Sequence, residues 1–121
     1  MTRIDAIKEA DRLKPNAFPA EDKLRWLERL EKRIRREILL QHEGTVPALG
    51  NFGSKELNLE LLVPSPYDEM YIHWLCAQMD YYNGEPDSFN ASNAMFEALF
   101  GQFRNDYRRE HRPLSREKRY S

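Results

Sequence analysis

Residues 87–111 read DSFNASNAMFEALFGQFRNDYRREH, and they carry the strongest periodic pattern in the chain. Mostly apolar side chains recur at spacings of three and four, the repeat of one face of an α-helix. This face consists of Phe89, Ser92, Phe96, Leu99, Phe100, Phe103 and Tyr107. Pro113 cannot continue a helix, so the predicted helix ends just before it. Its apolar face is expected to pack against other helices, which favours a mainly α fold.

Two helices are predicted near the start of the chain. The first covers 3–14, where Thr2 and Asp5 have the spacing of a capping box. The second covers 19–40 and has one apolar face made of Leu24, Leu27, Leu30, Ile34 and Ile38. Arginine, lysine and glutamate alternate between these positions, which is typical of a solvated face with ion pairs one turn apart. The alternative is a subunit interface of complementary charge.

A further helix is predicted over 66–83, with Ser65 in a capping position and Pro66 at the first helical residue. It is rich in tyrosine and tryptophan, which either form the core or cover an oligomer interface. Tyr81 and Tyr82 are adjacent, so both cannot face the same core. At least one of them is expected to be exposed or to contact another partner.

The connection 41–64 is long for a small domain and is broken by glycine and proline. Residues 57–61 alternate apolar and polar, as a half-buried strand does. A partner strand around 46–52 would complete a hairpin; the alternative is a loop folded onto its own core. The apolar candidates for contact with the helices, or with another subunit, are Val46, Leu49, Phe52, Leu57 and Leu59.

The chain has 121 residues, enough for one core, and a formal net charge of −1. This balance argues against a protein that binds nucleic acid along its whole surface. The charge is unevenly distributed, because residues 104–121 hold seven bases and three acids, a net +4, which leaves −5 for the rest. Such an arm suits an acidic partner, although a solvated tail is the alternative. Its bases include Arg108, Arg109, Arg112, Arg116, Lys118 and Arg119.

No pattern in the sequence indicates catalysis. His42, His73 and His111 are far apart, and none has a second ligand at the spacing of a metal site. Cys76 is the lone cysteine, and the glycines form no phosphate-binding loop. We therefore expect neither an enzyme nor a cofactor. The start of the chain has no apolar signal region, and no apolar run is long enough to span a membrane, so no membrane partner is expected.

Several segments, in order, resemble one family of tailed-phage proteins, the head–tail connectors, also called adaptor or head-completion proteins. They are LLVPSPYD at 61–68, DYYNGE at 80–85, FNASN at 89–93 and YRREHRP at 107–113. LKPN at 13–16 and KLRWL at 23–27 also match, so the resemblance covers about residues 2–113. The sequence departs from the family at Asp106, where a second aromatic residue is frequent.

The resemblance implies a four-helix protomer that forms a ring of about twelve copies below the portal. Such a ring extends the DNA channel, joins capsid to tail, and lets DNA pass without specific binding. Its partners would be further copies, the portal protein, and a stopper or tail-completion protein. The location would be the virion neck, after assembly in the host cytoplasm.

These considerations predict a helical domain over 1–113 and a basic tail over 114–121. Between the second and third helices lies a long extended or β-hairpin-like loop. The arm bases are assigned to the portal, and the loop residues to a neighbouring subunit or the stopper. The subunit interface is assigned to Glu28, Arg29, Arg33, Arg36 and Tyr81. The alternative function is a small helical nucleic-acid-binding regulator, which the Arg-rich second helix and the arm would suit.

Overall fold

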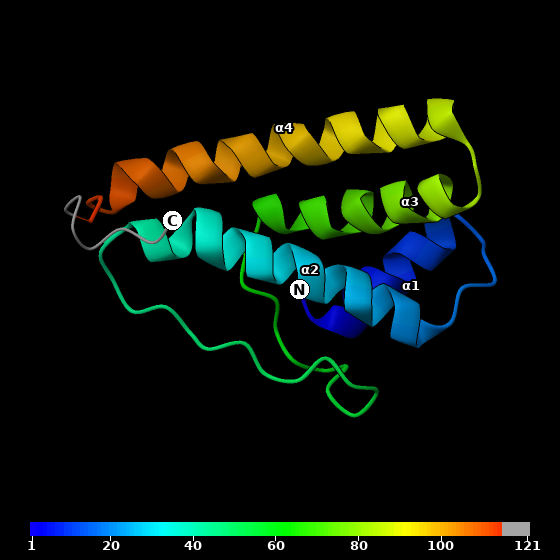
Figure 1. The fold of residues 1–121 in the computed structure, drawn as a ribbon, viewed down its shortest axis with the longest axis horizontal. Coiled ribbons are helices and arrows are strands. Elements are labelled where there is room, and N and C mark those ends of the chain that lie inside the picture. Colours follow the sequence, from blue (N-terminus) through cyan, green and yellow to red (C-terminus); the bar gives the residue numbers. More distant parts are fainter. Residues whose placement is uncertain (115–121) are drawn as a thin grey trace.

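The computed structural model describes residues 1–114 and contains four α-helices, which confirms the predicted mainly α class (Figure 1). These are α1 (Arg3–Leu13), α2 (Ala20–Glu37), α3 (Met70–Tyr82) and α4 (Pro86–Glu110). Two 3-10 turns accompany them: η1 (Leu39–Gln41) follows α2, and η2 (Tyr67–Glu69) precedes α3.

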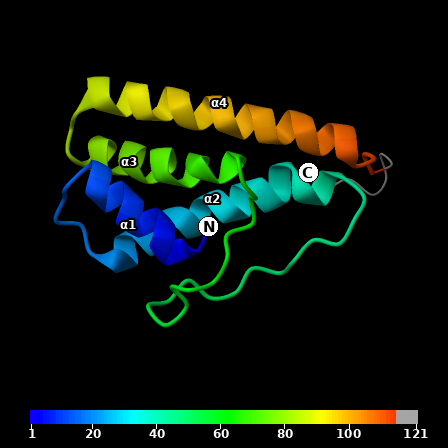
Figure 2. The ribbon, with the colours of Figure 1, turned by 180° about the vertical axis from the view of Figure 1, so that it is seen from behind.

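Helix α3 lies in the middle of the bundle, with α4 on one side and α1 and α2 on the other (Figures 1 and 2). Helices α2 and α4 run in the same direction, and α3 runs in the opposite direction. The first turns of α2 and α4 therefore lie at one end of the molecule, beside the last turn of α3. The last turns of α2 and α4 lie at the other end.

The core forms where the apolar faces of these helices meet. From the periodic face of α4, Phe96, Phe100 and Phe103 are buried, and Leu99 and Tyr107 are partly buried. Phe96 lies 5.1 Å from the Trp74 ring of α3 and 5.6 Å from the Phe100 ring, measured between centroids. Burying an aromatic side chain of this kind contributes about 1.5–3 kcal/mol, so this face holds α4 to α3.

The predicted cap of the first helix is confirmed, and that of the third is wrong. The Thr2 hydroxyl accepts from the Asp5 amide, and the Asp5 carboxylate accepts from the Thr2 amide, both at 3.2 Å. Ser65 makes no such cap, because the Tyr67 amide donates to the Pro64 carbonyl at 3.0 Å and opens the η2 turn. Helix α3 consequently starts at Met70, four residues later than predicted.

The long connection is extended, and no strand occurs among residues 1–114 (Figure 2). Its period-two segment pairs with the N-terminus: Arg3 and Ile4 donate their amides to the carbonyls of Leu59 and Leu57 at 3.0 and 2.9 Å. The Leu61 amide donates to the Met1 carbonyl at 3.0 Å. The first amides of a helix have no partner inside it, so the start of α1 supplies the donors that a hairpin strand would have supplied.

Candidate interaction surfaces

A buried carboxylate on α2 holds the returning end of the loop. Glu31 is only 2% exposed. Its two oxygens accept from the Leu62 amide at 2.9 Å and from the Tyr71 hydroxyl at 2.5 Å. The Tyr71 hydroxyl in turn accepts from the Val63 amide at 3.0 Å. This network ties residues 62–63 to both α2 and α3, because Glu31 belongs to α2 and Tyr71 to α3. Each buried polar group in it has a hydrogen-bond partner.

Burial perturbs the titration of both side chains in this network. It raises the pKa of the Glu31 carboxyl above its ordinary value of 4.5, while the hydrogen bonds from Tyr71 and Leu62 oppose the rise. It also raises the pKa of the Tyr71 hydroxyl well above its ordinary value, and the Glu31 charge adds to that shift. Loss of hydration is thus the dominant effect on Glu31.

This pKa shift predicts how stability depends on pH. A carboxyl with a raised pKa in the folded state favours folding when protonated, and the benefit declines as pH rises through the raised pKa. Relative to Glu31→Gln, the wild type should therefore be most stable near pH 4.5 and lose ground toward pH 7. Urea midpoints measured for both proteins between these pH values test this. A wild type that gains stability relative to Glu31→Gln as the pH rises would contradict it.

A buried arginine at the start of α1 holds the middle of the loop. The Arg3 guanidinium donates to the carbonyls of Asn51 at 2.5 Å and Glu56 at 3.3 Å. It also lies 3.5 Å above the centre of the Phe52 ring. Burial lowers the pKa of Arg3, but its ordinary value is so high that the group stays charged. The tip of the loop is thereby fixed to the N-terminus.

These anchors decide where the five predicted loop contacts lie. Val46, Phe52 and Leu57 are partly buried and pack against the protomer's own core. Leu49 is partly buried, and Leu59 is exposed. Leu49 and Leu59 both line a shallow cavity between the loop and α2. Of the five, Leu59 presents the most surface to another molecule.

The mixed charges of α2 largely contact the same protomer. Arg29 donates to the Gln78 side chain at 2.8 Å. Arg33 pairs with Glu37 at 2.9 Å and lies 4.3 Å above the Phe100 ring. Glu28 pairs with Lys32 at 3.4 Å. Among the predicted subunit-interface residues, Arg29, Arg36 and Tyr81 are exposed, whereas Glu28 and Arg33 are partly buried.

Exposed aromatic rings gather where α3 ends. Tyr81 is 64% exposed and Tyr82 is 54% exposed. The Tyr82 ring stacks on Trp26 of α2 with centroids 5.6 Å apart, and Tyr81 lies 6.1 Å from Phe89. The sequence indicated that the tyrosine pair would have at least one exposed member, and both are exposed.

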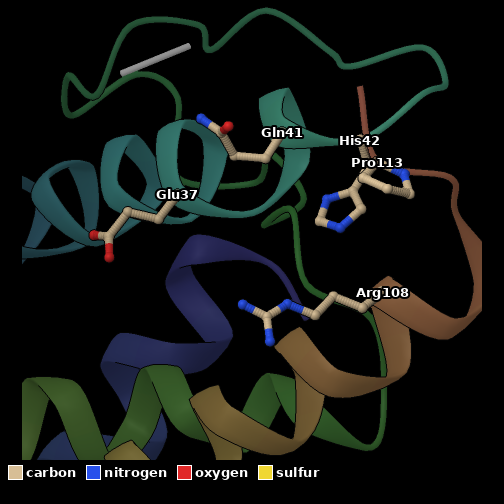
Figure 3. Close-up of a pocket in the computed structure, with 5 residues that line it drawn as sticks. All are labelled: Glu37, Gln41, His42, Arg108 and Pro113. Carbon is tan, nitrogen blue, oxygen red and sulfur yellow. The ribbon is translucent and has the colours of Figure 1, made fainter. Parts of the chain in front are cut away.

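A cavity of about 460 Å³ lies at the opposite end of the molecule (Figure 3). It is lined by Glu37, Gln41, His42, Arg108 and Pro113, and the Arg108 guanidinium extends from α4 toward α2. The His42 ring is held by a 2.7 Å hydrogen bond from Nδ1 to the Ile38 carbonyl, which leaves Nε2 for other contacts. Glu37 is paired with Arg33, and the other polar lining residues, Arg108 and His42 among them, favour the binding of a polar or acidic group.

The predicted arm begins inside α4. Arg108 lines the cavity, and Arg109 pairs with Asp106 one turn earlier. The chain then lies against the end of α2: the Arg112 carbonyl accepts from the Glu43 amide at 2.7 Å, and the Leu114 amide donates to the Gln41 carbonyl at 3.0 Å. Arg116, Lys118 and Arg119 lie outside the described residues.

No group of three metal-binding side chains comes together within residues 1–114. Cys76 is buried, and burial raises the pKa of its thiol, which makes it a poor nucleophile. Within the same range, no helix has the length and apolar character needed to cross a membrane. Comparisons with protein-family models, curated proteins and solved structures give no match.

Proposed function

We propose that this chain is a head–tail connector subunit of a tailed phage, which forms a ring below the portal. The proposal is carried by the ordered segments of family-like sequence over residues 2–113. The ring would extend the DNA channel and join the capsid to the stopper or tail proteins. Its location would be the virion neck, and the chemistry required is binding alone.

The positions of the family-like segments support this proposal. Residues 61–68 contain the Glu31-bound amide of Leu62 and lead into α3. Residues 80–85 comprise the last residues of α3, where Asp80 is buried, and the exposed turn that leads to α4. Residues 107–113 end beside the cavity. One segment therefore organises the protomer, and the other two occupy its opposite ends, where contacts with other molecules would form.

The portal contact proposed for the basic arm predicts the effect of a truncation after Leu114. Residues 112–114 stay, since two of them hydrogen-bond to Glu43 and Gln41, which follow α2. Loss of three bases and one acid should leave the free energy of unfolding within about 0.5 kcal/mol of the full chain. Affinity for the portal protein should fall about tenfold or more, because several charge contacts are lost together. Thermal melts and a portal-binding titration measure the two effects.

Two variants of the full chain separate charge from length. Joint replacement of Arg116, Lys118 and Arg119 by alanine should weaken portal binding as the truncation does. Lys55→Ala removes a base from the exposed loop and should leave binding unchanged. Unaltered binding of the truncated chain would refute the portal role of the tail. Salt-sensitive binding of duplex DNA, lost on truncation, would instead favour the nucleic-acid-binding alternative.

A further inference from the structure

The two ends of the protomer carry opposite charge. Where α2 and α4 begin, Glu21, Glu85 and Asp87 are exposed, and no base within residues 1–114 pairs with them. We call these three acids, with the exposed Tyr81 and Tyr82, the acidic end. The bases nearby already have partners, for example Lys14 with Asp80 at 2.7 Å.

The basic end lies at the other extreme of the long axis, where α2 and α4 finish (Figures 1 and 2). We define it by the exposed Arg36, Arg108 and Arg112, which line the cavity of Figure 3 themselves or are next in sequence to residues that line it. Arg108 lines the cavity itself. Helix α4 alone has 25 residues, so the two ends are separated by about 37 Å at 1.5 Å per residue.

Helix dipoles do not account for these charges. The starts of α2 and α4 each contribute about half a positive unit at the acidic end, and the end of α3 opposes them with about half a negative unit. Three full negative charges exceed that sum. The acidic end therefore stays negative. At the basic end the exposed Glu43 and Glu110 offset two bases, and Arg35 adds one base to the three arginines, which leaves a smaller excess of positive charge.

Shape complements charge. The acidic end is a projecting turn whose tyrosines are more than half exposed, and exposed tyrosine rings are enriched at interfaces. The basic end is concave and holds about 460 Å³ of space beside Arg108 and His42. A carboxylate with an adjacent tyrosine is the kind of group that this lining would accept.

We propose that the turn 81–87 of one copy docks on the cavity at the basic end of the next copy. One chain supplies both surfaces, and they differ from each other, so the contact is heterologous and a suitable rotation closes it into a ring. The inference rests on the proposed connector function and specifies its subunit contact. It assigns Arg108 to this contact and leaves the portal to the residues that follow Leu114.

Charge reversal at each end tests the proposal. Variant A is Glu85→Arg with Asp87→Arg, and variant B is Arg108→Glu with Arg112→Glu. Each variant by itself should need at least about a tenfold higher concentration to assemble, because like charges then face each other. This should hold both in free solution and on purified portal rings. A mixture of A and B should regain assembly, since every A–B contact joins opposite charges. Native mass spectrometry should then show alternating, even-numbered complexes.

The controls are Glu69→Arg and Lys8→Glu, each of which makes one charge reversal of the same kind at an exposed site on η2 or α1. Both should assemble as the wild type does, and circular dichroism melts verify that all variants are folded. Assembly of A and B at wild-type concentrations would overturn the proposal. The proposal would also be overturned if variants A and B both fail to assemble and a mixture of the two does not regain assembly. A wild type that never assembles would instead refute the connector function itself.

A covalent trap gives a second measurement that does not depend on charge. Asn83→Cys places a thiol on the turn, and Glu37→Cys places one at the cavity rim. The double variant, treated with a short bismaleimide, should give a ladder of linked copies that extends beyond the dimer. Each single variant should stop at the dimer or monomer, because Cys76 is buried. A double variant that also stops at the dimer would contradict head-to-tail docking.

Discussion

Glu31→Ala is expected to lower the free energy of unfolding by about 3–5 kcal/mol, because two buried hydrogen-bond donors lose their acceptor. The variant leaves the Leu62 amide and the Tyr71 hydroxyl without their acceptor, and each unsatisfied buried group costs about 1–3 kcal/mol. Urea denaturation at pH 7 measures the loss. The control is Glu28→Ala, three residues earlier on α2 in a partly exposed pair with Lys32, which should cost less than about 1 kcal/mol.

The same network predicts strong coupling between its members. Tyr71→Phe removes the hydroxyl that donates to Glu31 and accepts from Val63. Once Glu31 is gone, removing this hydroxyl should cost less than in the wild type, so the double variant should be more stable than the sum of the single losses implies. Equal losses for Glu31→Ala and Glu28→Ala would show that Glu31 does not hold the loop.

Phe96→Ala should lower the free energy of unfolding by a similar amount, about 3–5 kcal/mol. The ring is fully buried between α3 and α4, beside Trp74 and Phe100, and its removal leaves a cavity that helices cannot readily close. Met95→Ala is the matched control. Met95 is next to Phe96 in the sequence, but its side chain is 53% exposed, so the substitution should change stability by about 0.5 kcal/mol or less. Thermal and urea unfolding measure both variants, and equal losses would contradict the assigned packing.

The helices were predictable because their signals are local. A face of apolar residues at spacings of three and four defines α4, and a capping box defines the start of α1. The start of α3 was misplaced for a local reason too, since Ser65 and Pro66 fit a helix start but enter a 3-10 turn. Sequence rules assign the existence of an element more firmly than its first residue.

The partner of the loop was not predictable, because it depends on a contact between distant residues. The alternation at 57–61 indicated strand-like backbone but gave no register or partner. Its partner is the first turn of α1, which is itself a helix and carries no strand pattern. Arg3 likewise gave no sign that it would be buried against Asn51 and Phe52.

Part of the buried network did leave a signal in the sequence. Glu31 was grouped with the solvated charges of its helix, yet it stands four residues after Leu27 and three before Ile34, both on the apolar face. A charge on that face needs a buried partner, and Tyr71 supplies it. At the acidic end, the Phe18 ring packs against Trp26. Phe18 lies in the connection between α1 and α2, which has no periodic pattern, so the sequence did not predict this contact.

Under the proposed function, copies of this chain assemble into a closed ring on a portal. Native mass spectrometry of the full chain, alone and mixed with the portal protein that the proposed function requires, tests it most directly. We expect a single closed species of about twelve copies, formed alone or on the portal. A strict monomer at every concentration, which also never joins the portal, would contradict the account.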